Sequence, residues 1–372
     1  MPTDDEGHTS GEGHADGSGP ADEAGHALVD ENALRTFLAD RLGSAEQMAV
    51  DRIDAGYSNE TLELAWGDRE LVLRRPPPGE TADTAHDVLR EYRVIDALQE
   101  SSVPVPPTVL ACEDASVIGS QFYLMERVDG VVIRASEPGR FGTPAHRETI
   151  GAETVDTLAA IHNVDYEAVG LGDFGHPEGF AQRQVKRWSE QFTWAFGTTA
   201  EAREVPAIYE LMEWLGEHAP ESHPHRLVHG DYKLDNVLFA PGTPPDLAAV
   251  FDWEMATLGD PRTDLGWLLS FWHDPGDSPA VLPDLEPTFT AREGYPTRRE
   301  LVARWEDATG LSYEHDRFYR TLAVYKLAGL GEMFFARYLQ GHADSDFYAR
   351  MEDAVPELAD RALRIAEGEE PL

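Results

Sequence analysis

The chain has 372 residues and carries 69 acidic against 30 basic side chains, a net charge of −39 at pH 7. This length accommodates two lobes with sizeable cores, and so acidic a chain excludes nucleic-acid binding through a basic surface. No apolar run approaches the roughly 18 residues of a membrane span, and the single cysteine, Cys112, excludes an internal disulfide. We therefore expect a cytoplasmic protein with no membrane partner and no obligate protein partner.

Lysine is almost absent from the chain. Apart from Lys186, Lys233 and Lys326, every basic residue is an arginine. An acidic surface nearly free of lysine is typical of a protein that works in high salt, where the Debye length is short and self-repulsion is screened. A GC-rich genome, which favours arginine codons, is the alternative explanation. Lys233 stands out because it lies inside a polar loop.

The N-terminal third predicts a tail followed by a small β-rich lobe. Residues 1–26 are rich in Gly, Asp, Glu, Ser and His and predict a disordered tail, because they bury too little apolar surface to offset the entropy of ordering. Residues 27–127 alternate apolar and polar positions in short runs, with one strongly periodic helix. The expected elements are helices over 28–42 and 83–99, and strands over 48–53, 61–66, 70–74, 108–112 and 121–127.

Helices dominate the rest of the chain, 128–372. No low-complexity linker precedes this region, so we expect two tightly joined lobes. The expected helices are 148–162, 180–196, 206–218, 264–272, 298–309, 314–340 and 346–365. The Pro- and Asp-rich residues 273–297 predict a loop.

One stretch, 227–264, places polar residues at the ends of short apolar runs. Its loop HGDYKLDN contains Asp231 and Asn236, and Asp252 follows a strand predicted over 247–251. A strand–loop–strand scaffold is how rigid elements present catalytic groups. Carboxylate and amide oxygens suit Mg²⁺ and phosphate chemistry. This stretch therefore predicts the catalytic centre.

The β-rich lobe carries weaker signals. Residues 55–60, AGYSNE, form a short Gly/Ser/Asn loop that can offer backbone N–H groups to phosphates, although an ordinary hairpin explains it as well. Arg74 on a strand and Glu91 on the following helix can pair to hold a phosphate-binding group, and the alternative is two solvated charges.

The loop HGDYKLDN with the downstream run FDWEMATLGDPRTDL resembles the aminoglycoside phosphotransferase family of small-molecule kinases. The segments VLRRPPPG, LREYRVIDAL, VPVPP and CEDASVIGSQFYLMERVDG extend the resemblance over about residues 45–340, towards the branch that includes the kinase-like domain of some acyl-CoA dehydrogenase fusions. The resemblance implies an α+β, bilobal, protein-kinase-like fold. An N-terminal antiparallel sheet lobe with one main helix, 27–127, would bind nucleotide, and a larger, mostly helical lobe, 128–372, would hold the catalytic and substrate residues.

The resemblance also implies roles for the polar stretch. Asp231 is expected to accept the proton of the attacking hydroxyl, and Lys233 to neutralise charge on the transferred phosphoryl group. Asn236 and Asp252 are the expected Mg²⁺ ligands. Two further residues, His229 and Asp264, are expected to support the loop, with a helix N-cap as the alternative role for Asp264.

The nucleotide site shows one departure from the family. Where a strand lysine is usual, this chain has Arg74 followed by Arg75, and Arg74 is favoured as its equivalent with Glu91 as its partner. The choice between the two arginines stays open. The other residues expected to bind the nucleotide are Ser58, Asn59, Met125 and Arg127.

The expected activity is transfer of a phosphoryl group from ATP or GTP, with Mg²⁺, to a hydroxyl of a small metabolite. The branch suggests a hydroxyacyl-CoA or a hydroxy acid as acceptor. A nucleotide-binding pseudokinase, an aminoglycoside or amino-alcohol kinase, and a protein kinase are the alternatives; no Ala-Pro-Glu-like ending follows Asp252 to support the last. The aromatic residues that either line the acceptor pocket or fill the core are Trp267, Trp272, Tyr325 and Phe334.

Overall fold

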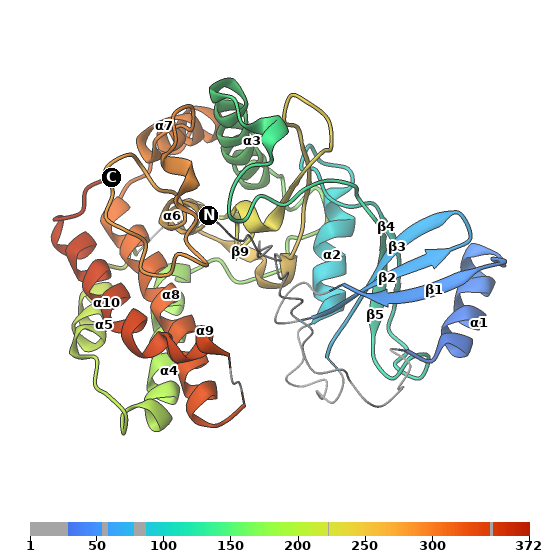
Figure 1. Ribbon diagram of the computed structural model, residues 1–372, viewed down its shortest axis with the longest axis horizontal. Coiled ribbons are helices and arrows are strands. Elements are labelled where there is room, and N and C mark those ends of the chain that lie inside the picture. The colour runs from blue at the N-terminus through green and yellow to red at the C-terminus, as the bar shows by residue number, and fades with distance from the viewer. Residues whose placement is uncertain (1–28, 54–58, 78–86, 222, 343–344) are drawn as a thin grey trace, which may run out of the picture.

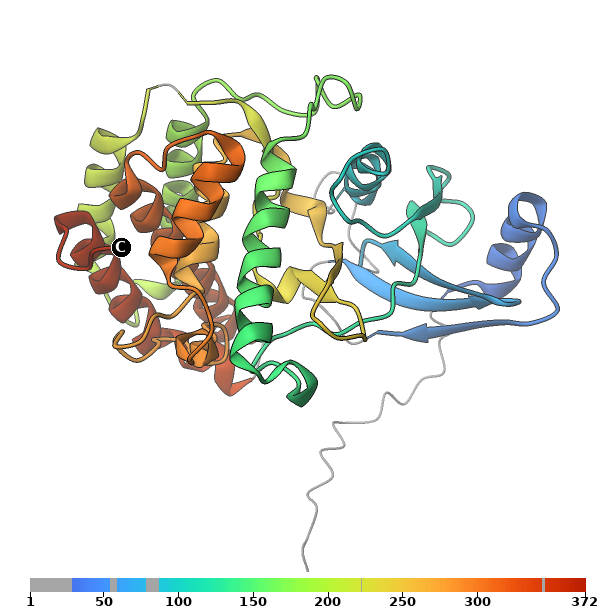
Figure 2. The same cartoon turned by 90° about the horizontal axis from the view of Figure 1, so that it is seen from above.

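The computed structural model describes residues 29–53, 59–77, 87–221, 223–342 and 345–372. Figures 1 and 2 show a twisted sheet with α1 and α2 beside a larger body of helices, which confirms the expected α+β bilobal fold. The predicted tail 1–26 and Ser58 lie outside the described residues. The lobe boundary expected at 127/128 stays a prediction.

The smaller lobe is built on an antiparallel sheet of order β1-β2-β3-β5-β4. The sheet has two buried faces, because the central strand β3 buries consecutive side chains, which alternate between its two sides, whereas β2 buries only every second one. One face packs Leu62, Leu64 and Leu73 against Leu34 and Leu38 of α1. The other face packs against α2. The strands and helices of this lobe are α1 (Glu31–Leu42), β1 (Met48–Arg52), β2 (Glu60–Trp66), β3 (Arg69–Arg75), α2 (Val88–Leu98), β4 (Thr108–Cys112) and β5 (Phe122–Glu126).

The larger lobe buries most of its aromatic residues between long helices. Its longest helix, α8, packs against α4, α6 and α10. Two short strand pairs, β6 with β9 and β7 with β8, lie on the side of this lobe that faces the sheet. The elements are α3 (Pro144–His162), α4 (Phe180–Thr199), α5 (Pro206–His218), β6 (Arg226–Val228), β7 (Val237–Phe239), β8 (Leu247–Val250), β9 (Thr257–Gly259), α6 (Arg262–Ser270), α7 (Arg298–Thr309), α8 (Asp316–Leu339), α9 (Asp346–Ala349) and α10 (Met351–Glu367); one-turn 3₁₀ helices cover Gly139–Phe141, Leu234–Asn236, Trp253–Met255 and Thr288–Ala291.

The structure differs from the expected elements in two places. The strand β9 was not expected, because three residues are too few to show a period and only their pairing with β6 defines them. The helix expected over 346–365 is divided at Arg350 into α9 and α10. The reason is packing: α9 buries no side chain, whereas α10 buries an apolar face against α8.

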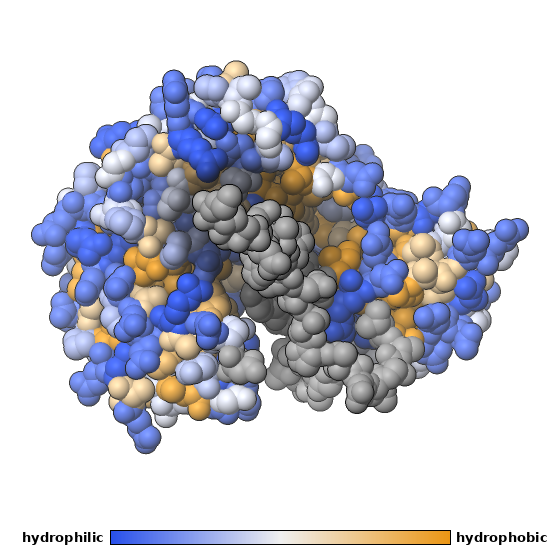
Figure 3. Space-filling view, in the orientation of Figure 1, coloured by the Kyte–Doolittle hydropathy of each residue, from blue (hydrophilic) through white to orange (hydrophobic). Residues whose placement is uncertain are grey.

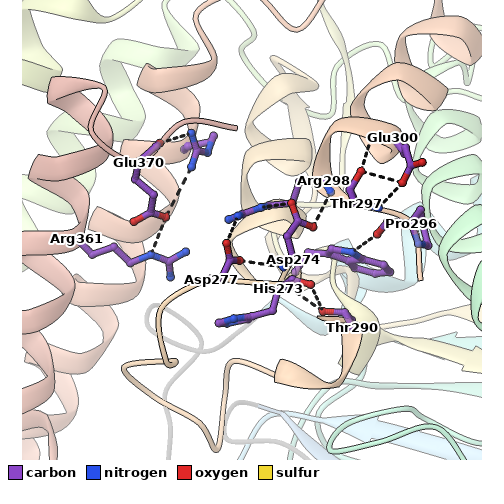
Figure 4. Close-up of polar contacts among 12 residues, drawn as sticks. His273, Asp274, Asp277, Thr290, Pro296, Thr297, Arg298, Glu300, Arg361 and Glu370 are labelled. Carbon is purple, nitrogen blue, oxygen red and sulfur yellow. Dashed lines mark hydrogen bonds and ion pairs between the residues drawn. The ribbon is translucent and has the colours of Figure 1, made fainter. Parts of the chain in front are cut away.

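The predicted loop 273–297 is held to the helices around it by polar contacts (Figure 4). Arg298 at the start of α7 donates to Asp274 at 3.2 Å and to Asp277 at 2.7 Å. The backbone N–H of His273 donates to Thr290 Oγ1, and Trp272 Nε1 donates to Pro296 O. These bonds fix the segment that follows α6, the helix that carries Trp267.

Hydrophilic residues cover much of the face seen in Figure 3, as the acidic composition predicts. Among the described residues, no helix combines the length and apolarity needed to cross a membrane.

Candidate active site

The loop HGDYKLDN is fixed at both ends by strand pairs. β6 leads into it and pairs with β9, placing Val228 opposite Thr257. β7 leads out and pairs with β8, and the N–H of Phe251 donates to the carbonyl of Asn236 at 3.1 Å. This bond brings Asn236 next to Phe251, the residue before Asp252, although Asn236 and Asp252 lie 16 positions apart in the chain. The scaffold therefore joins the two predicted polar positions.

Asp231 is held through both carboxylate oxygens. Trp267 Nε1 donates to Oδ1 at 2.7 Å, and Asn236 Nδ2 donates to Oδ2 at 2.9 Å. Lys233 Nζ lies 3.6 Å from Oδ2, and the Asp231 side chain keeps 22% of its surface exposed. The carboxylate is thus held in one orientation, lies close to the ammonium of Lys233 and remains accessible to a substrate.

Asp252 occupies an unusual backbone conformation. Its φ is 67°, and in the described part of the chain His315 is the only other non-glycine residue with positive φ. This left-handed conformation is strained for a residue with a Cβ and persists where its surroundings impose it. Glu91 Oε1 accepts a hydrogen bond from the next backbone N–H, that of Trp253, at 3.2 Å. The turn therefore aims the Asp252 carboxylate away from β8 and towards the sheet lobe, where Arg74 lies.

Arg74 connects the sheet to Asp252. Its Nε lies 3.4 Å from Glu91 Oε2 and its Nη2 lies 3.4 Å from Asp252 Oδ1. Burial raises the pKa of Glu91 to about 7, although the positive charge of Arg74 acts to lower this pKa. Arg75 is paired with Glu60 at 2.6 Å instead. The structure thus brings Arg74, and not Arg75, to the metal-binding position expected from the sequence.

Asp264 supports the loop from below. Its carboxylate accepts the backbone N–H groups of His229 at 2.6 Å and Gly230 at 2.9 Å. His162 Nδ1 accepts from Trp305 Nε1 at 2.9 Å, so its Nε2 carries the proton that faces Asp264 at 3.3 Å. Burial acts to raise the pKa of Asp264, but the hydrogen bond from His162 and those from the backbone lower it below its ordinary value. Asp264 is a buried carboxylate that fixes the start of the loop.

His229 has both ring nitrogens engaged within the loop. Nδ1 accepts the N–H of Asp231 at 3.2 Å, and Nε2 donates to the carbonyl of Phe251 at 3.1 Å. Burial lowers the pKa of this histidine, which favours the neutral ring these two bonds require. Such a ring ties the loop to the strand before Asp252 and is not free to transfer protons.

The residues fit a nucleotide and a hard cation. The side-chain N–H₂ of Asn236 donates to Asp231, so the amide oxygen of Asn236 remains available to a cation. The Asp252 side chain keeps 28% of its surface exposed. Mg²⁺ takes few protein ligands when phosphate oxygens complete its shell. Arg74 Nε, Glu91 Oε2 and Asn59 Oδ1 are buried without a hydrogen-bond partner among the described residues. Unmatched buried donors and acceptors of this kind are expected where a ligand completes the site.

The remaining predicted nucleotide residues are placed less closely. Asn59 Nδ2 donates to Glu254 Oε2 at 3.4 Å, which brings the end of the 55–60 loop near the Asp252 turn. Met125 is buried on β5. Arg127 forms ion pairs with three carboxylates, those of Glu63, Glu70 and Asp129. The nucleotide roles of these residues stay predictions.

A cavity of about 950 Å³ opens beside the catalytic loop. It lies between α4 and α8, and Gly230 and Trp267 line its catalytic end. Of the four aromatic residues considered for the acceptor pocket, only Trp267 lines it. Trp272, bonded to Pro296 O, and Tyr325, bonded to Ser189, are buried core residues, and the half-buried Phe334 packs on Phe347.

Sequence reasoning missed the basic lining of this cavity. Five basic side chains and four acidic ones line it, in a chain where acidic residues outnumber basic ones 69 to 30. The five are Arg90, Arg183, Lys186, Arg187 and Lys326. The rarity of lysine, which drew attention to Lys233, applied equally to Lys326. Helix α4 also brings Arg183, Lys186 and Arg187 to one face at helical spacing.

A sheet lobe, a helical lobe, an oriented aspartate on the loop and a second, strained aspartate after β8 define a small-molecule kinase of the protein-kinase-like class. The chain belongs to the phosphotransferase enzyme family, whose model matches residues 49–301. The expected resemblance is thereby confirmed.

Individual relatives agree with this membership. The chain is 33% identical over 346 residues to acyl-CoA dehydrogenase family member 11 of Homo sapiens, covering 91% of this chain and 43% of that protein. It therefore spans less than half the length of that relative. A solved Ralstonia eutropha protein named as an aminoglycoside phosphotransferase is 34% identical, with a TM-score of 0.79 over 91% of this chain and 99% of that one. The GDP complex of aminoglycoside 2'-phosphotransferase-IIIa shares the fold alone, at 13% identity and a TM-score of 0.59 over 89% and 99% of the two chains.

Proposed function

We propose that the protein transfers the γ-phosphoryl group of ATP or GTP, with Mg²⁺, to a hydroxyl of an acidic small molecule such as a hydroxy acid or a hydroxyacyl-CoA. The observation that carries the proposal is the oriented carboxylate of Asp231. It is held by Trp267 and Asn236 and opens next to a cavity of substrate size.

In the proposed reaction the acceptor O–H bond breaks and its proton passes to Asp231. The acceptor oxygen forms a bond to the γ-phosphorus while the bond to the bridging oxygen breaks, and the nucleoside diphosphate leaves with that electron pair. Lys233, 3.6 Å from Asp231, lies where it would neutralise charge on the transferred group. Such chemistry needs positioning and charge neutralisation more than covalent help.

The nucleotide would be held from the sheet side. Arg74 offers a guanidinium fork for phosphate oxygens, oriented by its ion pair with Glu91. Asn236 and Asp252 would hold Mg²⁺, whose chemistry is to neutralise phosphate charge and align the transferred group. Structures of the same fold bound to GDP and to ADP support a nucleotide as co-substrate.

The lining of the cavity, where basic side chains outnumber acidic ones five to four in an otherwise strongly acidic chain, favours an acidic acceptor. Aminoglycosides and amino alcohols carry ammonium groups, which basic side chains such as Arg183, Arg187 and Lys326 would repel. The names of the curated relatives, which include acyl-CoA dehydrogenase family members, agree with a carboxylate or a CoA thioester. A pseudokinase is disfavoured because the base and both expected metal ligands are present together.

The test compares wild type with Asp231→Asn in high KCl and Mg·ATP. The acceptor panel contains hydroxy acids, their CoA thioesters, amino alcohols and aminoglycosides. Nucleoside diphosphate release that depends on an acidic acceptor, and that falls about 10²- to 10⁴-fold in the variant, supports the proposal. Nucleotide binding should be retained in the variant. Tight Mg·ATP binding without turnover above Asp231→Asn on any acceptor would establish a pseudokinase instead.

A further inference from the structure

Lys326 lies on α8 and lines the acceptor cavity beside the catalytic loop. Its Nζ donates to the carbonyl of Gly230 at 2.6 Å, one residue before Asp231. The same ammonium lies 3.8 Å from the ring centroid of Trp267, the residue that holds Asp231. A partly buried cation thus sits at the catalytic end of the cavity.

This lysine has no carboxylate partner within ion-pair distance in the part of the chain that the structure describes. The other two lysines do: Lys186 lies 3.6 Å from Glu190 and Lys233 lies 3.6 Å from Asp231. A charge in a buried place is costly unless it is paired. The protein has 69 acidic residues, yet this lysine at the cavity wall has no carboxylate partner among those described. Its charge is therefore suited to an anion that enters the cavity from outside the chain.

The geometry around Lys326 leaves room for that anion. An ammonium has three N–H donors, and Gly230 O takes one of them. The Lys326 ammonium lies over the face of the Trp267 ring, whereas the Asp231 carboxylate accepts the ring N–H at the ring edge, and the two groups form no ion pair within the described part of the chain. The lysine therefore does not saturate the base, and its remaining donors are free to meet a group that enters the cavity.

We propose that Lys326 is the specificity-determining residue of the acceptor site, and that it binds an anionic group of the acceptor close to the hydroxyl that is phosphorylated. The inference rests on the proposed function. It adds the residue that selects the acceptor and the placement of the acceptor's charge. A phosphate or sulfonate would satisfy the same donors as a carboxylate.

The first experiment measures kcat/KM for matched short hydroxy compounds that differ in one group: a carboxylate, an uncharged amide or an ammonium. Wild type should prefer the carboxylate. In Lys326→Met the carboxylate-to-amide ratio of kcat/KM should fall at least about tenfold, because one charged hydrogen bond is lost. In Lys326→Arg most of the wild-type ratio should be retained. Lys326→Glu should move the preference towards the ammonium compound. Arg337→Met, an exposed position on the same helix, is the matched control and should leave the ratio unchanged.

A ratio between two acceptors separates selection from a structural effect, because a damaged site lowers both values together. The inference is overturned if wild type turns over the panel but Lys326→Met keeps the carboxylate preference. Absence of turnover on every acceptor would instead count against the proposed function.

A second measurement does not need turnover. Carbamoylation by cyanate followed by peptide mass spectrometry resolves each of the three lysines, Lys186, Lys233 and Lys326. The carboxylate probe should slow modification of Lys326 relative to the same lysine without a probe, whereas the ammonium probe should not. Equal modification of Lys326 with and without the carboxylate probe, at the highest concentration tested, would contradict the proposal even in the absence of activity.

Discussion

The indole N–H of Trp267 donates to Oδ1 of Asp231 at 2.7 Å, across 36 positions of sequence. Asn236 occupies the other carboxylate oxygen. The carboxylate of Asp231, the proposed base, is therefore oriented from two sides, by the loop that carries it and by α6, which packs on α8. Helix α6 thus positions the reacting group from outside the motif, and its effect can be measured separately.

Trp267→Phe should lower kcat about 10- to 100-fold, because it removes one hydrogen bond to a charged group and leaves the ring in place. The KM for nucleotide should change little. Steady-state kinetics with the best acceptor of the panel measure both constants. Trp272→Phe is the matched control, since its indole N–H bonds to Pro296 O, and it should leave kcat unaffected. Equal kcat values in the two variants would refute the positioning effect of Trp267.

Arg74→Met should raise the KM for nucleotide by about 10- to 100-fold, because Arg74 faces Glu91 and Asp252 at the nucleotide site. Arg74→Lys, which restores the residue usual in the family, should lose less. Arg75→Met on the same strand removes a cation paired with Glu60 and should leave nucleotide KM unchanged. A larger effect at Arg75 than at Arg74 would reverse the assignment.

Asp264→Asn should destabilise the fold by about 2 kcal/mol or more, because one amide oxygen cannot replace a carboxylate that accepts from both His229 and Gly230. Urea unfolding followed by tryptophan fluorescence gives the free energy of unfolding. Asp156→Asn breaks an exposed ion pair with Arg304 and should cost less than about 1 kcal/mol. Similar losses in the two variants would show that the buried bonds to the loop contribute little.

The preference for anionic acceptors should weaken above about pH 8. Burial lowers the pKa of Lys326 to about 8; Asp231 and Asp264 oppose this lowering, while Lys233 and Arg187 add to it. The lysine is therefore charged below this pH and loses its charge as the pH rises through it. The carboxylate-to-amide ratio of kcat/KM should fall over this range in wild type. In Lys326→Arg the ratio should stay level, because arginine remains protonated; a parallel fall there would assign the titration to another group.

Stability should increase with salt. At a net charge of −39 the folded protein repels itself, and at about 1 M salt the Debye length is only about 3 Å. The midpoint of thermal unfolding should therefore rise between dilute buffer and molar KCl, most steeply in the first part of the range. If the midpoint were insensitive to KCl, the acidic composition would reflect codon usage and not adaptation to salt.

The sequence alone determined the fold class and predicted which loop is catalytic. The periods of 2 and 3.6 residues are local properties of strands and helices, so β1 to β5, α2 and most later helices lie close to where they were expected. The spacing of Asp231, Asn236 and Asp252 is likewise a property of one continuous stretch, which lies within the residues matched by the family model. The sequence did not predict the strand β9 or the division between α9 and α10, because such short elements are defined by the segments that they pair or pack with.

Only the tertiary structure decided which residues from distant parts of the chain contact Asp231, Asn236 and Asp252 or the loop around them. Strand alternation put Arg74 and Arg75 on opposite faces, but packing of the sheet against α2 and the Asp252 turn decided that Arg74 faces the site. The same is true of Trp267 on α6 and Lys326 on α8, which read as ordinary helix positions until the two helices pack beside the loop. Local sequence fixes a backbone period, whereas the partner of a buried charge depends on contacts between segments far apart in the chain.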